Sequence, residues 1–219
     1  MDNSFDREAI SKMRRSYGEV GLPDELATSD PLALFSQWLA DAAANPMVIE
    51  ANAMVLSTRH GDGVISRTVL LKGVSDRSFT FFTNYNSRKA RDIDSNPAVS
   101  LLFPWYPLER QVIVTGRAHR VSELESDEYF ASRPWSSQIG AWASHQSEPL
   151  QSRELLEAQW QECAERYPEG SVVPRPPHWG GFAVTADTIE FWQGRYSRLH
   201  DRLRFSHSET GWKVGRIFP

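Results

Sequence analysis

The sequence contains a single cysteine, Cys163, which excludes an internal disulfide framework and any zinc site built on cysteine. Its six histidines are scattered without the spacing of metal ligands, so no histidine-rich metal site is expected. No hydrophobic run approaches the length that crosses a membrane, and the N-terminal residues lack the apolar stretch of a secretion signal. The expected location is therefore the cytoplasm, with no membrane partner.

Motifs of several common enzyme classes are also missing. The chain has no glycine-rich phosphate loop, no G-x-G-x-x-G, no H-E-x-x-H and no G-x-S-x-G. A net charge of −4 argues against nucleic-acid binding, because no broad positive field surrounds the protein. Lysine is scarce, with four among 24 basic residues, so a lysine in an apolar strand or at a helix start indicates a point charge suited to phosphate.

Hydrophobic periodicity predicts a mainly antiparallel β-barrel with peripheral helices. Strands are expected at residues 53–58, 64–74, 78–83, 99–103, 111–121, 179–184, 188–192, 201–206 and 212–217, the first three forming a meander. Capping and stop signals predict helices over residues 30–44, 86–96 and 122–132, the first and last of these with Asp30 and Ser122 as N-caps. A further helix is expected after Pro149, to about residue 167. We expect one domain over residues 30–219, preceded by a mobile N-terminal arm over residues 1–29.

Basic residues recur where these elements begin and end. Arg67 and Lys72 bracket an apolar run, and the two-residue period of a strand places them on opposite faces unless a bulge intervenes. They are therefore expected to contact different anions. The alternative is an edge strand whose charges extend into water.

The start of the helix at 86–96 predicts a phosphate site. Arg88 and Lys89 lie in its first turn, where cations oppose the helix dipole by a few tenths to about 1 kcal/mol. Ser87 is expected to cap this helix. A bound anion would reverse the penalty by using free backbone N–H groups, a hydroxyl and both cations. A solvated helix start is the alternative.

A second anion grip is predicted near the end of the helix at 122–132. Tyr129 and Arg133 are four residues apart and share a helix face, and Ser137 follows in the next turn. Tyrosine, arginine and serine are all common at helix ends, so this grip has an ordinary structural alternative. Two anion grips near an aromatic side chain suggest a phosphorylated planar cofactor and a phosphorylated substrate.

The C-terminal segment places Arg198, His200 and Arg202 within five residues, directly after an aromatic strand that contains Trp192. Such a concentration of cations beside a buried strand is costly unless an anion meets it. Trp192 is positioned to pack against a flat ring. The alternative is a surface loop with a salt bridge through Asp201.

The chain resembles the pyridoxamine (pyridoxine) 5′-phosphate oxidases, flavoenzymes of vitamin B6 metabolism. The resemblance is carried by residues 67–72, 82–89, 100–105, 129–144 and 179–182, and most specifically by residues 190–193 with 198–202. It implies an FMN-binding split β-barrel and a homodimer with FMN at the subunit interface. It also implies oxidation of pyridoxamine 5′-phosphate and pyridoxine 5′-phosphate to pyridoxal 5′-phosphate, with hydride transfer to flavin, oxygen as electron acceptor and hydrogen peroxide as product.

The resemblance further implies roles for individual residues. The FMN contacts, some from the partner subunit, would be Arg67, Thr68, Val69, Leu70, Leu71, Lys72, Phe82, Thr83, Arg88, Lys89, Gln111, Gln146, Ser147, Trp192 and Arg202. The substrate contacts would be Arg14, Tyr17, Lys72, Tyr129, Arg133, Ser137, Arg198 and His200. Among these, Arg198 and His200 would be catalytic, and Arg14 with Tyr17 would close as a lid.

Two other functions fit part of this pattern. A split-barrel flavin or deazaflavin reductase has no need of a second phosphate grip, so the Tyr129, Arg133 and Ser137 group argues against it. A carrier that binds pyridoxal 5′-phosphate without catalysis would contain no flavin and would consume no oxygen.

Overall fold

The computed structural model describes residues 7–13, 15–28 and 30–219. In this part of the chain one antiparallel sheet contains β1 (Ala53–His60), β2 (Gly63–Leu70), β3 (Gly73–Ser75), β4 (Ser78–Asn84), β5 (Ala98–Trp105), β6 (Arg110–Arg120), β7 (Trp179–Gln193), β8 (Asp201–Ser208) and β9 (Gly211–Arg216). The pairing order is β2-β1-β5-β6-β7-β4-β3, with β8 pairing β7 and β9 pairing β8. The predicted class, mainly β with peripheral helices, is confirmed.

The helices are α1 (Arg7–Lys12), α2 (Pro31–Ala44), α3 (Arg88–Ser95), α4 (Glu123–Ala131), α5 (Trp135–Ala143) and α6 (Arg153–Arg166). Short 3-10 turns occur at η1 (Asp24–Thr28), η2 (Tyr106–Leu108) and η3 (Tyr196–Arg198). None of the described helices is long and apolar enough to cross a membrane.

The predicted strand at 64–74 is wrong, because the chain forms two strands there. It breaks at Leu71 and Lys72, whose backbone N–H groups donate to the carbonyls of Asn52 and Thr80 respectively. The chain thereby leaves β1 and joins β4, so the expected three-strand meander is also wrong. Strands β2 and β3 consequently lie at the two ends of the pairing order, which leaves the barrel split between them.

The predicted strands at 179–184 and 188–192 are one continuous strand, β7. Its first half pairs with β4 and its second half with β8, while β6 runs beside both halves. The β6–β7 register shifts between Thr115 and Gly116. A side chain at Gly116 would bring a Cβ within 2.1 Å of the Thr185 carbonyl oxygen, so only glycine fits at this irregularity. This shared strand joins the two parts of the sheet.

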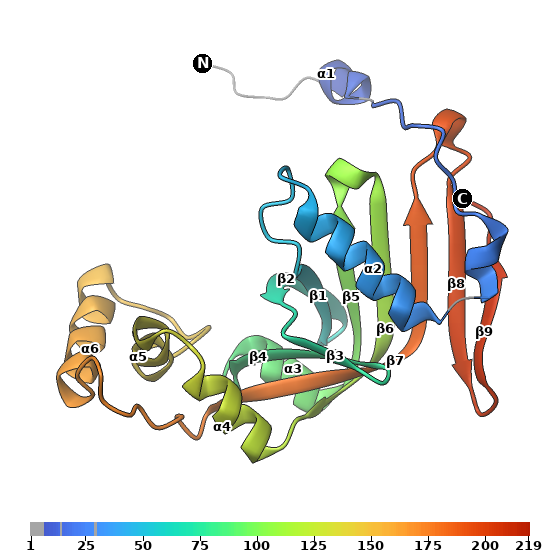
Figure 1. Ribbon diagram of the computed structural model, residues 1–219. Coiled ribbons are helices and arrows are strands. Elements are labelled where there is room, and N and C mark those ends of the chain that lie inside the picture. Colours follow the sequence, from blue (N-terminus) through green and yellow to red (C-terminus); the bar gives the residue numbers. More distant parts are fainter. Residues whose placement is uncertain (1–6, 14, 29) are drawn as a thin grey trace.

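Helix α2 covers one face of the sheet and supplies the centre of the hydrophobic core (Figure 1). As predicted, Asp30 caps it by accepting from the Leu32 N–H, with Pro31 in the first helical position. Phe35 packs edge-on against Phe79 and Phe103, with ring centroids 5.0 and 4.9 Å apart. The helix thus fixes the barrel half that carries β4 and β5.

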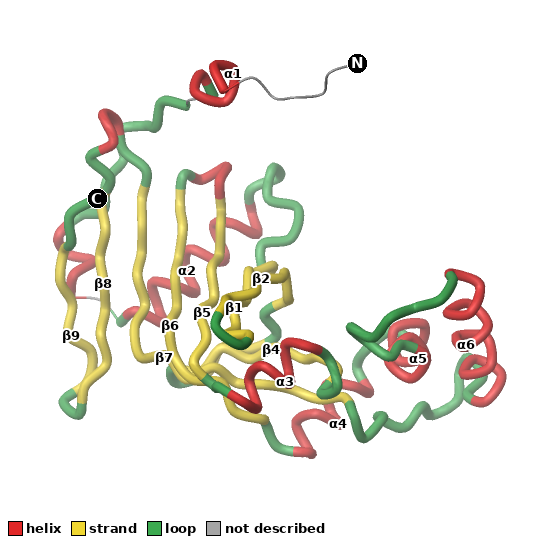
Figure 2. Tube along the Cα trace, turned by 180° about the vertical axis from the view of Figure 1, so that it is seen from behind, coloured by secondary structure: helices red, strands yellow, loops and turns green. Residues whose placement is uncertain are grey.

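Helix α5 was not predicted, because Gly140 and two serines weaken its intrinsic helix propensity. Tertiary contacts stabilise it instead. Gln138 donates to two carbonyls at the end of α4 and to the Arg133 carbonyl in the turn after it. Trp135 packs edge-on against Trp160 of α6, with centroids 5.6 Å apart. Helices α5 and α6 form a lobe at one side of the molecule, whereas β8 and β9 lie at the opposite side (Figures 1 and 2).

Candidate active site

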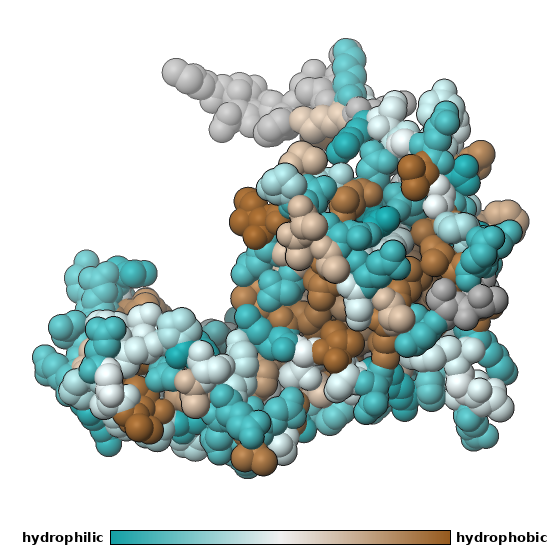
Figure 3. Space-filling model, viewed as in Figure 1, coloured by the Kyte–Doolittle hydropathy of each residue, from teal (hydrophilic) through white to brown (hydrophobic). Residues whose placement is uncertain are grey.

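A cavity of about 730 Å³ lies where β2, β4, α3, α4 and α5 meet. The space-filling view shows a deep notch between the lobe that carries α5 and α6 and the body of the sheet (Figure 3). The cavity brings together eleven of the predicted site residues: Thr68, Val69, Leu70, Lys72, Phe82, Thr83, Lys89, Tyr129, Arg133, Ser137 and Gln146. These residues come from positions up to 78 apart in the chain, so the fold alone places them on one surface.

One end of the cavity is the start of α3, where Lys89 is half-buried. Its Nζ donates to Gln146 Oε1 at 2.6 Å, Thr83 Oγ1 at 3.0 Å and Ser87 Oγ at 3.2 Å. All three acceptors are neutral. Burial, together with the charge of Arg67, lowers the pKa of Lys89 to about 8. An anion at this end would return the amine toward its ordinary pKa.

The N-terminus of α3 is not capped by Ser87 as predicted, and Ser147 contacts it instead. Ser87 occupies the N-cap position, but its hydroxyl forms no capping bond and accepts from Lys89 instead. Ser147, whose φ of 75° lies in the left-handed region, accepts from the Arg88 N–H at 3.2 Å. The loop after α5 therefore closes over the first turn of α3.

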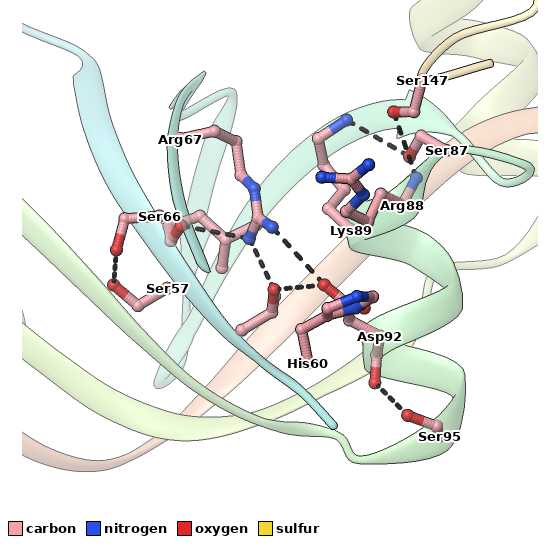
Figure 4. A network of polar contacts seen from close by, with 12 residues as sticks. Ser57, His60, Ser66, Arg67, Ser87, Arg88, Lys89, Asp92, Ser95 and Ser147 are labelled. Carbon is pink, nitrogen blue, oxygen red and sulfur yellow. Dashed lines mark hydrogen bonds and ion pairs between the residues drawn. The ribbon is translucent and has the colours of Figure 1, made fainter. Parts of the chain in front are cut away.

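Arg67 lies behind this end and does not line the cavity. Its Nη1 donates to Thr58 Oγ1 at 2.7 Å, and its Nη2 lies 3.5 Å from Asp92 Oδ2 (Figure 4). Burial and the charge of Arg88 lower the pKa of Arg67, although Asp92 partly compensates. From the sequence, strand alternation predicts that Arg67 and Lys72 lie on opposite faces. Because β2 ends at Leu70, before Lys72, this alternation does not apply to the pair. Leu71 is buried in the core and likewise does not line the cavity.

The other end of the cavity holds Arg133, whose guanidinium carbon lies 4.7 Å from the centroid of the Trp179 ring. Its Nη1 is buried and has no hydrogen-bond partner among the described residues. Burial lowers the pKa of this guanidinium. A buried cationic donor without a partner is costly, and an anion in the cavity would satisfy it.

Aromatic rings support this second end. Tyr129 stacks on Phe82 with centroids 4.0 Å apart, and both lie nearly parallel to Trp179. Lys72 Nζ lies 5.9 Å from the centre of the Tyr129 ring. Helix α4 ends at Ala131, so Arg133 lies in the turn after it rather than on the predicted shared face. Tyr129 and Arg133 nevertheless both line the cavity.

The C-terminal group lies outside this cavity. Trp192, His200 and Tyr17 form an aromatic cluster, with Trp192–His200 centroids 4.7 Å and Tyr17–His200 centroids 5.3 Å apart. His200 Nδ1 accepts from the Arg195 N–H, and burial followed by the charge of Arg198 lowers its pKa. Arg198 has a φ of 62°, a strained value for a residue with a side chain. The predicted lid residue Arg14 lies outside the described residues.

Arg202 forms two hydrogen bonds to Glu190 Oε1, at 2.8 and 2.6 Å. The alternative salt bridge through Asp201 does exist, but its partners are Arg195 and Arg216. Gln111 pairs with Trp192 in the β6–β7 register and also lies away from the cavity. Within one described chain, the predicted site is therefore divided between two separate regions.

Sequence reasoning missed two residues that shape the cavity and its surroundings. It placed Trp179 only at the start of a predicted strand, whereas this ring forms the wall against which Arg133 packs. It did not consider Asp92, a buried carboxylate on α3 one turn after Arg88. The i,i+4 spacing from Arg88 was the available signal.

Comparison with known proteins identifies the family of the chain. Residues 40–167 match the family described as pyridoxamine 5′-phosphate oxidase, and residues 179–219 match the pyridoxine 5′-phosphate oxidase C-terminal dimerisation region. The chain belongs to the pyridoxamine 5′-phosphate oxidase family. It is therefore an oxidase of that family, as the resemblance of its sequence implied.

The chain is similar to two proteins named pyridoxine/pyridoxamine 5′-phosphate oxidase. The one from Streptomyces avermitilis is 50% identical over 98% of this chain and 99% of the relative, and the one from Rubrobacter xylanophilus is 52% identical over 97% and 98%. The crystal structure of PhzG from Burkholderia lata in complex with tetrahydrophenazine-1-carboxylic acid matches with a TM-score of 0.84 and 32% identity over 92% and 99% of the two chains. This oxidase-family fold is thus shared over nearly the whole chain.

Proposed function

We propose that the protein oxidises pyridoxamine 5′-phosphate and pyridoxine 5′-phosphate to pyridoxal 5′-phosphate in vitamin B6 biosynthesis and salvage, with FMN as its cofactor. The observation that carries this proposal is a cavity lined by two cations with separate sets of partners, Lys89 bonded to Gln146 and Arg133 packed against Trp179. Two ends of this kind suit two phosphate esters, one on the cofactor and one on the substrate. The names of the relatives at about 50% identity support the same pair of substrates.

The start of α3 has the donor set that an FMN phosphate needs. Lys89 is charged, half-buried and held only by neutral oxygens, and Arg88 lies beside it at the helix N-terminus. Thr68, Val69 and Leu70 would line the rest of the cofactor site from β2. Bound FMN would supply the redox chemistry, namely acceptance of a hydride from the C4′ carbon of the substrate and reoxidation by oxygen to give hydrogen peroxide. With the amine substrate, water would hydrolyse the resulting imine and release ammonia.

The substrate phosphate would bind at the end formed by Arg133, Lys72, Tyr129 and Ser137. The buried Nη1 of Arg133 would donate its unused N–H groups to the phosphate, and the Tyr129 ring stacks on Phe82 in the same cavity. Anchoring both phosphates fixes the distance between the reacting rings, which is the main contribution a protein makes to such a reaction.

The C-terminal group completes the site from a second subunit. Gln111, Trp192, Arg198, His200 and Arg202 lie away from the cavity of their own chain, and all except Gln111 fall in the family's dimerisation region. In the homodimer, Arg198 would orient the substrate and favour charge that develops in the transition state. His200, whose lowered pKa keeps its imidazole neutral near pH 7, would accept a proton. Tyr17 already contacts both His200 and Trp192 and would close over them.

The test is oxygen uptake by the purified cytoplasmic protein with each phosphorylated vitamer and with each unphosphorylated form. A yellow, flavin-containing sample that consumes oxygen only with the phosphorylated vitamers is expected. Equal rates with and without the phosphate would contradict the Arg133 end. A flavin-containing sample that turns over neither vitamer would favour a reductase, and a flavin-free sample that binds pyridoxal 5′-phosphate would favour a carrier.

A further inference from the structure

A buried polar network behind the cavity links β2, β1 and α3 (Figure 4). We propose that Thr58 and Asp92 are positioning residues that hold the guanidinium of Arg67 beside the start of α3, from which its remaining N–H groups would contact the phosphate of FMN. This inference rests on the proposed cofactor site at the start of α3. It adds two residues that do not line the cavity.

Hydrogen bonds connect Arg67 to Asp92 both directly and through Thr58. Arg67 lies opposite Leu56 in the β1–β2 register, and its Nη1 donates to the Leu56 carbonyl at 3.3 Å and to Thr58 Oγ1 at 2.7 Å. The Thr58 hydroxyl donates in turn to Asp92 Oδ2 at 2.7 Å. Arg67 Nη2 reaches the same carboxylate oxygen at 3.5 Å, and His60 Nδ1 lies 2.7 Å from the other oxygen.

Burial makes this arrangement rigid. Thr58 is 1% exposed, the Asp92 side chain 5% and the Arg67 side chain 19%. Burial raises the pKa of Asp92, but hydrogen bonds from His60 and Thr58 and the charges of His60 and Arg67 outweigh it and lower the pKa overall. Asp92 is thus an ionised carboxylate at neutral pH, and its charge-assisted contacts hold the guanidinium in one place.

Cation crowding explains why a positioning anion is needed. The charge of Arg88 lowers the pKa of Arg67, and the charge of Arg67 lowers that of Lys89, so Arg67 is repelled by both cations of the first turn of α3. Asp92 offsets this repulsion from the side away from the cavity and ties the β1–β2 hairpin to the helix that carries the other two. A guanidinium has five N–H donors, more than the three acceptors of this network, so donors remain for a phosphate.

Neutralising Asp92 should change FMN affinity in opposite directions, depending on whether this residue positions Arg67 or only repels the phosphate. The carboxylate of Asp92 repels a phosphate dianion, so neutralising it would strengthen FMN binding if only Coulomb interactions mattered. If Asp92 orients Arg67, the same change weakens binding. Thr58 separates the two effects further, because Thr58→Val removes the relay hydroxyl and leaves the net charge unchanged.

The experiment titrates the apoprotein with FMN and follows quenching of flavin fluorescence. The Thr58→Val variant loses a hydrogen bond to a charged group, so its affinity for FMN should be about tenfold lower or weaker still. The matched control is Ser57→Ala, which removes the neighbouring hydroxyl, bonded at 2.8 Å to Ser66 on the opposite face of the same two strands. This control should bind FMN as the unmodified protein does. Asp92→Asn should bind FMN more weakly.

A double-mutant cycle identifies the route of the effect. In an Arg67→Met background, Thr58→Val should add no further loss of FMN affinity, because the side chain that it positions is gone. Thermal unfolding of each apoprotein accompanies the titrations. If Thr58→Val does not fold, Asp92→Asn with Arg67→Met forms the same cycle.

The outcomes separate this inference from the function on which it rests. Failure of the unmodified protein to bind FMN would reject the proposed cofactor site itself. Tight FMN binding that is unchanged in Thr58→Val, strengthened in Asp92→Asn, or lost additively in the Arg67→Met background would overturn the positioning role alone.

Discussion

The amine of Lys89 allows the proposed cofactor site to be tested by titration. Its pKa is lowered to about 8 by burial and by Arg67, and its three hydrogen-bond acceptors carry no charge. A phosphate ester stays dianionic above pH 7, since its second pKa is about 6. We therefore expect FMN to bind the form of the protein in which Lys89 is protonated.

The expected magnitude follows from the pKa. An amine with a pKa of about 8 is mostly protonated at pH 7 and only about one-tenth protonated at pH 9, so FMN affinity should fall about tenfold over that interval. A tenfold change in affinity corresponds to about 1.4 kcal/mol. The fall reflects the loss of one positive charge from the first turn of α3.

The stability of the apoprotein should respond in the opposite direction. Because the pKa of Lys89 is 10.5 unfolded and about 8 folded, the unfolded chain binds more protons between these values, and stability rises with pH across that window. Below pH 8 both states are protonated and the cost of burying the charge is fully present. The full shift corresponds to about 3 kcal/mol, which partial exposure of the side chain reduces to about 1–2 kcal/mol.

The assay is a fluorescence titration with FMN at pH 7, 8 and 9, alongside urea unfolding of the apoprotein at the same values. Lys89→Arg is the matched control, because it keeps the positive charge but cannot be deprotonated in this range. Its FMN affinity should be independent of pH, whatever its absolute value. A flat profile in the unmodified protein, or an equal slope in Lys89→Arg, would refute the assignment of this charge to the cofactor site.

Three further substitutions test other parts of the structure. Arg133→Met should raise the KM for pyridoxamine 5′-phosphate by about two orders of magnitude, as expected for loss of a buried charged contact, while FMN affinity and unfolding midpoint do not fall. Arg198→Ala should reduce kcat far more than FMN retention, and equal loss of both would make Arg198 structural. Glu190→Gln leaves Arg202 and Arg204 without their shared carboxylate. The free energy of unfolding measured with urea should fall by about 2–3 kcal/mol, less than for a fully buried ion pair because both arginines are partly exposed. An unchanged midpoint would contradict this last expectation.

Much of the fold follows from local signals along the chain. Alternating apolar residues mark the strands, and Asp30 and Ser122 start α2 and α4 with the predicted side-chain caps. These signals act over a few residues, which is the range of a turn or of a strand's two-residue period. The crowding of Arg88 and Lys89 at a helix start, and the arginines and histidine after β7, are visible for the same reason.

Tertiary structure alone decided which of these residues meet. The break at Leu71 and Lys72 depends on pairing with Asn52 and Thr80, and α5 depends on packing against α6, so neither is encoded within its own segment. Arg67 is turned toward α3 by a carboxylate 25 positions away. The sequence by itself determined where most of the strands lie, the caps of α2 and α4, and which cations the chain contains. Long-range pairing determined which cations share a cavity, because backbone hydrogen bonds and burial between distant segments set the distances on which charge interactions depend.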